Sequence, residues 1–152
     1  YMLNQGFENE VRRWHDAHPD VRLHFFWDKR DAPAELRVDD TLTLHRIDDE
    51  QFLHYMAGCR GYITTAGFES VCEALYLNKP VMLIPAHLEQ EINAADASSI
   101  PGAATTGDSF DLSHLLDFMQ TPRTFDHDTF RRWLLSAEET FIRELTSVVD
   151  RE

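Results

Sequence analysis

The stretch that decides the fold is residues 61–94, GYITTAGFESVCEALYLNKPVMLIPAHLEQEINA. Tyr62–Thr64 is a short β-prone run, and the residues at 65–67 interrupt it. Apolar side chains then fall at the i, i+3, i+4 and i+7 positions of one helix face, namely Phe68, Val71, Cys72 and Leu75. Pro80 cannot continue that helix, and residues 81–84 form an unbroken apolar run typical of a strand buried on both faces of a parallel sheet. The stretch therefore predicts a strand–helix–strand unit with polar residues at both strand exits, where open α/β sheets bind their ligands.

The sequence on either side continues the alternation of strands and helices. We expect strands at residues 1–3, 21–27, 41–45 and 103–106, and a surface connection over the charged residues 28–40. We expect helices from Phe7 to about residue 18, over residues 51–57 after a cap at Asp48 or Asp49, over residues 89–97 and 111–119, and from a cap at Asp128 through Leu145. The predicted fold is α/β: a Rossmann-like, three-layer parallel sheet flanked by helices, in one domain over residues 1–152.

Composition excludes several classes of protein. The formal net charge is −13, which argues against a nucleic-acid-binding domain because such domains carry a basic footprint. No apolar run approaches the roughly 20 residues of a membrane span. The two cysteines form no CxxC pair, which favours a reduced, cytoplasmic compartment over a disulfide scaffold. Tyr1 is not an initiator methionine, and we expect the chain to be a piece of a longer protein.

A set of short motifs lies along the central stretch: residues 65–70 (TAGFES), 73–74 (EA), 79–80 (KP), 84–85 (IP), 89–90 (EQ) and 93–94 (NA). Together they resemble the donor-binding, C-terminal half of GT-B glycosyltransferases, above all the bacterial peptidoglycan N-acetylglucosaminyltransferase and its relatives. The resemblance implies an inverting transfer from a UDP-sugar donor without a metal or other cofactor. It also implies an N-terminal acceptor domain of the same protein, and a cytoplasmic location that leaves open contact with the inner face of the membrane.

The turn at Thr65, Ala66, Gly67 and Phe68 is the predicted diphosphate site. A helix N-terminus presents unpaired N–H groups and the positive end of the helix dipole, which favour a phosphate. Gly67 would let the backbone approach that phosphate closely. Because the net charge repels an anionic donor, such local groups have to supply the attraction. The alternative is that Gly67 only makes a tight turn.

The resemblance assigns three further residues to the nucleoside. Glu73 corresponds to the acid that accepts hydrogen bonds from the ribose hydroxyls, whereas Glu69 is expected only to complement the helix dipole. Arg46 and Ile47 lie at a strand exit that holds the base in relatives, with the backbone of Ile47 facing the uracil edge. The alternative for this exit is a capped strand–helix junction.

Four more residues are candidates for the diphosphate and the donor sugar. Gly6 ends a loop, LNQG, where relatives carry Gly-Ser-Gln-Gly, so that only Gln5 and Gly6 match. Glu89 and Gln90 correspond to the pair that reads the sugar hydroxyls, with helix capping as the alternative. His87 is a candidate contact to the phosphate or the sugar.

No catalytic base is identified in this chain. The eight histidines are scattered, His45 and His54 have no evident partner, and a histidine pair at 15 and 18 lacks a third ligand, so no metal site is expected. The resemblance places the base in the missing acceptor domain, and the fragment alone is predicted to be inactive in transfer. Two other hypotheses stay open: a nucleotide-sugar hydrolase or 2-epimerase of the same fold, and a non-catalytic nucleotide-binding or protein-interaction domain.

Overall fold

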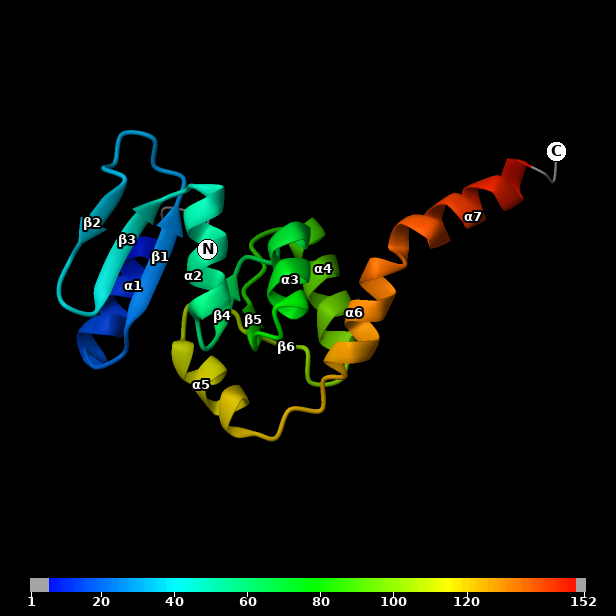
Figure 1. Cartoon of the computed structure of the whole chain (residues 1–152). Helices are drawn as coiled ribbons and strands as arrows, with labels where there is room; N and C mark the ends of the chain where they lie inside the picture. Colours follow the sequence, from blue (N-terminus) through cyan, green and yellow to red (C-terminus); the bar gives the residue numbers. More distant parts are fainter. Residues whose placement is uncertain (1–5, 150–152) are drawn as a thin grey trace.

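Short strands alternate with helices along the computed structural model, which describes residues 6–149 (Figure 1). The elements in chain order are α1 (Gly6–Ala17), β1 (Leu23–Trp27), β2 (Glu35–Arg37), β3 (Leu42–Arg46), α2 (Asp49–Gly58), β4 (Tyr62–Thr64), α3 (Phe68–Tyr76), β5 (Val81–Leu83), α4 (Leu88–Ser99), β6 (Ala104–Thr106), α5 (Leu112–Gln120), α6 (His127–Leu135) and α7 (Ala137–Val149).

The strands form two three-stranded sheets, in the orders β1-β3-β2 and β4-β5-β6. β1 pairs with β3 in parallel, and all strands of the second sheet are parallel. The predicted α/β fold with a parallel sheet flanked by helices is therefore confirmed. The strand predicted at residues 1–3, and the loop that precedes Gly6, lie outside the described residues.

One strand was missed. Residues 28–40, predicted as a surface connection, contain β2, which pairs with β3 in antiparallel orientation. All three side chains of β2 are exposed, so the sequence shows no apolar pattern that would predict this strand. Backbone hydrogen bonds to β3 create it.

The predicted last helix is also divided. The side chain of Asp126, and not that of Asp128, caps α6 by accepting a hydrogen bond from the Thr129 N–H. The helix then breaks at Ser136, with φ −92° and ψ 0°, and α7 begins at the next residue. The predicted cap at Asp48 is present at α2, where its side chain accepts from the Gln51 N–H.

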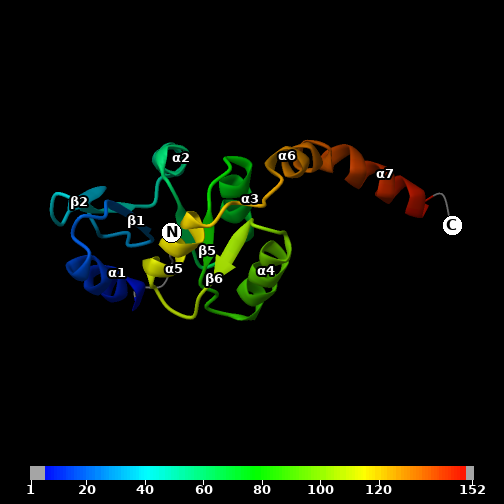
Figure 2. The ribbon, with the colours of Figure 1, turned by 90° about the horizontal axis from the view of Figure 1, so that it is seen from below.

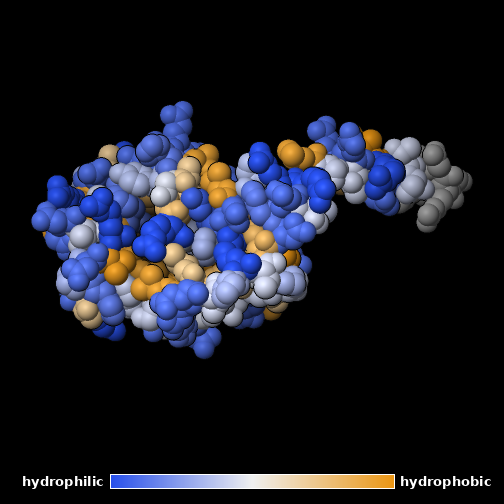
Figure 3. All heavy atoms as spheres, turned by 60° about the horizontal axis from the view of Figure 1, so that its bottom comes forward, coloured by the Kyte–Doolittle hydropathy of each residue, from blue (hydrophilic) through white to orange (hydrophobic). Residues whose placement is uncertain are grey.

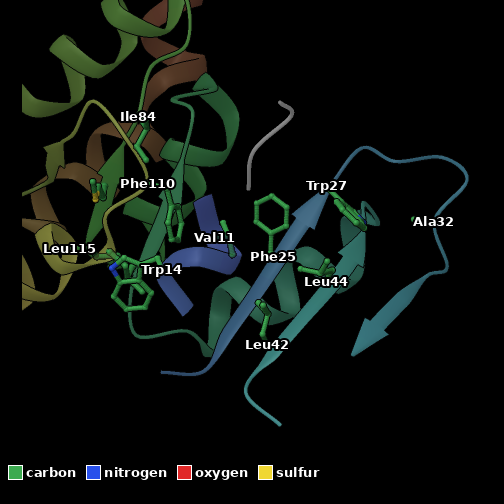
Figure 4. Close-up of a cluster of buried hydrophobic side chains, with 12 residues drawn as sticks. Val11, Trp14, Phe25, Trp27, Ala32, Leu42, Leu44, Ile84, Phe110 and Leu115 are labelled. Atoms are coloured by element: carbon green, nitrogen blue, oxygen red, sulfur yellow. The ribbon is translucent and has the colours of Figure 1, made fainter. Parts of the chain in front are cut away.

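Two apolar clusters cover the two faces of β5. Met82 and Ile84 belong to the first cluster, which joins α1, β1 and β3 to α5 (Figure 4). Val81 and Leu83 belong to the second cluster, which joins α3, α4 and α6 to the same strand. Because neighbouring side chains of a strand point to opposite faces, this division shows that β5 is buried on both sides, as its apolar run predicted.

The last helix protrudes from the rest of the molecule (Figures 1 and 2). Large apolar side chains on α6 and α7 are exposed, and Figure 3 shows a few hydrophobic spheres among mostly hydrophilic ones on these two helices. They are Trp133, Leu135, Phe141, Ile142 and Leu145, each between 54% and 69% exposed.

Within residues 6–149, no helix combines the length and apolar character needed to cross a membrane.

Two histidines that looked unrelated in the sequence form a pair beneath α2. His24 Nδ1 lies 2.9 Å from His45 Nε2, and the His45 ring is fully buried. The His45 ring stacks on Phe26 and contacts Tyr55 of α2. The expectation that His45 has no partner was therefore wrong, because the contact depends on the register of β1 against β3. Loss of hydration is the main cause that lowers the pKa of both histidines, although only His45 is fully buried and His24 remains exposed.

This pair predicts loss of stability in mild acid. A histidine whose pKa is lowered in the folded state binds protons less readily than in the unfolded chain, so the stability present above the ordinary value of 6.5 falls as the pH drops below it. Urea unfolding between pH 7.5 and pH 5 should show a steeper pH dependence for the native protein than for the double variant His24→Gln/His45→Gln. The matched control is His87→Gln, which changes an exposed histidine at the start of α4. Equal slopes for native protein and double variant would contradict the prediction.

Candidate functional site

The parallel strands bring several polar turns to one edge of the second sheet. Thr64 is in register with Leu83, and Leu83 is in register with Thr106, so the three strands end together. The turns into α3 and α4 leave from neighbouring strands at this carboxyl edge. This is the position where open α/β sheets bind ligands.

The turn into α3 owes its shape to Ala66. Ala66 has φ 68° and is fully buried, whereas Gly67 has the ordinary values φ −63° and ψ 135°. A Cβ atom built on Gly67 would meet only Ser70 Oγ, at 3.8 Å. The backbone of the tight turn therefore does not require glycine at position 67. Because glycine has no side chain, nothing at position 67 covers the exposed start of α3.

The first turn of α3 keeps its N–H groups available. Gly67 occupies the N-cap position, and no side chain caps the helix. The first N–H groups of an α-helix lack acceptors within the helix, and they carry the positive end of its dipole. Phe68, the first helical residue, is 65% exposed beside them. This end of α3 can thus bind an anion through the backbone alone.

Two side chains of α4 form hydrogen bonds to the turn that precedes α3. The Gln90 amide accepts a hydrogen bond from the Ala86 N–H at 2.9 Å and donates one to Thr65 Oγ1 at 3.3 Å. Asn93 donates to the Ala66 carbonyl at 3.1 Å. Side chains of α4 therefore stabilise the left-handed conformation of Ala66. The residues of the turn and of α3 do not by themselves reveal this contact.

Glu73 lies on α3 beyond the turn, half-buried. Burial raises its pKa, and the neighbouring carboxylates of Glu69 and Asp49 raise it further. Within the described part of the chain, no hydrogen bond or ion pair is made to the Glu73 carboxylate. The carboxylate therefore keeps its capacity to accept hydrogen bonds from hydroxyl groups.

The remaining predicted residues differ in exposure and in their backbone contacts. Arg46 ends β3 and is exposed, whereas the N–H of Ile47 donates to the Trp27 carbonyl at 3.1 Å, so its carbonyl is the backbone group left for a base. His87 is the N-cap of α4, and Glu89 lies in its first turn; both are exposed. Gly6 is the exposed first residue of α1.

An apolar groove of about 690 Å³ runs between α3, α4 and α6. Phe68 and Asn93 line it near the turn, and Trp133 lines it at α6. Neither Glu73 nor the exit of β3 contributes to its lining. The groove therefore meets the predicted diphosphate turn at Phe68 but includes neither Glu73 nor the exit of β3.

Comparison with known proteins identifies the family. The family model described as Glycosyl transferase family 1 matches residues 17–121, which is more than half of the chain. The chain belongs to glycosyl transferase family 1. The matched segment contains α2, α3, α4 and all of the candidate residues except Gly6. The description of the family names the transfer of glycosyl groups as its chemistry.

A solved structure supports the fold of this family 1 domain. It is described as the glycotransferase of kitacinnamycin, and it matches with a TM-score of 0.67 at 17% sequence identity. The match covers 88% of this chain and 36% of that chain, so the family 1 domain corresponds to about a third of that protein. Such low identity bears on the fold alone. No curated protein matches the sequence.

No metal centre is evident in the described residues of the family 1 domain. Over residues 6–149, no group of three or more His, Cys, Asp or Glu side chains is arranged to hold a metal ion. The chemistry that these residues offer is backbone binding of an anion at α3, together with a carboxylate and a backbone carbonyl for hydroxyl and amide donors.

Proposed function

We propose that this family 1 domain is the donor-binding, C-terminal half of a GT-B glycosyltransferase, and that its donor is a UDP-sugar. The observation that carries the proposal is the combination on α3 of a bare, uncapped N-terminus at Gly67 with the unpartnered carboxylate of Glu73. The diphosphate would bind the N–H groups of the first turn. The ribose hydroxyls would donate to Glu73, and the uracil N–H would donate to the Ile47 carbonyl.

This arrangement assists the departure of the nucleotide. In an inverting transfer, the acceptor oxygen attacks the anomeric carbon from one side while the bond to the diphosphate oxygen breaks on the other. The leaving UDP gains negative charge, and fixed N–H dipoles stabilise charge that develops next to them. The acceptor loses its proton to a general base, which we assign to the acceptor domain outside these residues. Residues 1–152 alone should therefore bind donor without transferring sugar.

The exposed apolar side chains on α6 and α7 indicate that these helices contact another part of the protein. Exposed apolar surface of this kind usually marks an interaction site. We assign it to contact with the acceptor domain of the same protein. Separate expression of the two parts should then yield a complex, and Phe141→Ser on α7 should weaken it.

Nucleotide titration tests the proposed donor. Calorimetry on residues 1–152 should give a measurable affinity for UDP, weaker affinity for uridine, which lacks the diphosphate, and weaker affinity for ADP, which lacks the uracil edge. Absence of binding by all three would overturn the proposal. A nucleotide-sugar hydrolase or 2-epimerase would use the same donor site. Product analysis of the full-length protein, with and without acceptors, distinguishes these enzymes from a transferase and from a non-catalytic nucleotide-binding domain.

A further inference from the structure

We propose that Gln90 is a positioning residue that shapes the diphosphate turn, and that Glu89 beside it is left to contact the donor sugar. This inference rests on the proposed donor site. It departs from the expectation that Glu89 and Gln90 both read the sugar hydroxyls. The difference between the two neighbours is one of burial: Gln90 is 8% exposed, whereas Glu89 is exposed.

Both ends of the Gln90 amide are occupied within the protein. The Ala86 backbone N–H can only donate, so the atom 2.9 Å from it must be the Gln90 oxygen. This contact fixes the orientation of the amide and directs its NH₂ group to Thr65 Oγ1, at 3.3 Å. The side chain of Gln90 thus joins the turn that follows β5 to the turn that follows β4.

A role in reading the sugar would require these bonds to break. Turning the Gln90 amide toward a ligand would leave the Ala86 N–H without its acceptor and would separate Thr65 from α4. Gln90 and Thr65 are both buried, and a polar group left unpaired in a buried place is unfavourable, so the amide is held where it is. Glu89 has no comparable bond in the described residues, and its carboxylate is free to accept hydrogen bonds from hydroxyl groups.

The contacts of Gln90 reach the predicted diphosphate through the backbone. Thr65 directly precedes Ala66, whose left-handed conformation sets the direction in which the chain enters α3. Asn93, three residues after Gln90 and on the same side of α4, holds the Ala66 carbonyl. The two side chains therefore fix consecutive residues of the turn, and they orient the N–H groups of Gly67 and Phe68 without touching the ligand themselves.

Binding of UDP compared with UDP-sugars tests this assignment. UDP lacks the donor sugar, so loss of a contact to the donor sugar cannot change its affinity. Gln90→Ala is expected to weaken UDP, UDP-glucose and UDP-N-acetylglucosamine by the same factor, about tenfold, because the diphosphate turn is loosened for all three. Glu89→Ala is expected to leave the affinity for UDP unchanged and to alter the affinity for at least one UDP-sugar.

The inference would be overturned by a loss of affinity that is confined to UDP-sugars. If Gln90→Ala binds UDP as the native protein does and loses affinity only for UDP-sugars, Gln90 reads the sugar. If the native protein binds no uridine nucleotide at all, the proposed donor site fails, which is a different result.

A measurement on native protein covers the case in which Gln90→Ala does not fold. The NMR signals of the Gln90 side-chain NH₂ group should move by the same amount with UDP as with each UDP-sugar. In the ligand-free protein, these NH₂ protons should exchange slowly with solvent because the group is buried and hydrogen-bonded. A shift seen only with UDP-sugars, or fast exchange of the NH₂ protons, would contradict a positioning role.

Discussion

Replacing Glu73 with alanine is expected to weaken the binding of uridine nucleotides by about 1.5–3 kcal/mol for each of the one or two charged hydrogen bonds lost. The reason is that the carboxylate of Glu73 has no partner in the described residues and can accept both hydroxyl groups of a ribose. Calorimetric titration of UDP against the native domain and the variant measures the effect. The expected loss of affinity is therefore at least about tenfold.

The matched control is Glu69→Ala, which removes an exposed carboxylate one helical turn earlier on α3. This control should change the UDP affinity much less. A second comparison uses 2′-deoxy-UDP, which should bind the native domain more weakly than UDP but should bind Glu73→Ala as well as UDP does. Equal affinities of the native domain and Glu73→Ala for UDP would remove Glu73 from the ribose site.

The raised pKa of Glu73 adds a pH dependence to the same experiment. Burial and two neighbouring carboxylates raise the pKa of Glu73, so this carboxylate takes up its proton at a higher pH than an ordinary glutamate does. Protonation removes part of its acceptor capacity, and UDP affinity should fall as the pH is lowered toward that range. Glu73→Gln should show a smaller dependence on pH over the same interval.

Replacing Leu83 with alanine is expected to lower the free energy of unfolding by about 2–5 kcal/mol. Leu83 lies on β5, between β4 and β6, and its side chain is fully buried in the second apolar cluster. Truncation there loses apolar burial and leaves a cavity that the two neighbouring strands cannot readily close. Urea unfolding of the native domain and the variant, followed by circular dichroism, measures the difference.

An exposed leucine provides the control for this core substitution. Leu135 is 69% exposed at the end of α6, and Leu135→Ala should change the free energy of unfolding by no more than about 0.5 kcal/mol. A loss below 1 kcal/mol for Leu83→Ala, or similar losses for both variants, would show that β5 is not the centre of the packed core.

The central unit could be predicted from sequence because its periodicity coincides with its burial. Tyr62–Thr64 and the start of α3 at Phe68 appear where the pattern placed them, and the apolar run at residues 81–84 is buried on both faces. Residues 65–67 do form a turn at a strand exit. Each of these features depends on side chains close together in the chain, whose spacing directly reflects the geometry of a strand or a helix.

The details of the site could not be predicted in the same way. Glycine at 67 indicated a special backbone position, yet Ala66 is the residue in the left-handed conformation. Asn93, 27 residues later in the chain, donates a hydrogen bond to the Ala66 carbonyl. The motif joined Glu89 to Gln90, yet the rotation of α4 exposes one and buries the other. Neither outcome follows from residue type alone.

By itself, the sequence determined the alternation of strands and helices, the burial of β5 and the turn before α3, because local spacing specifies each of them. Only the tertiary structure decided that β2 joins a sheet, that His24 meets His45 and that Gln90 faces Thr65. These contacts arise between segments far apart in the chain. Strand register and helix packing set their distances, and no local pattern encodes them.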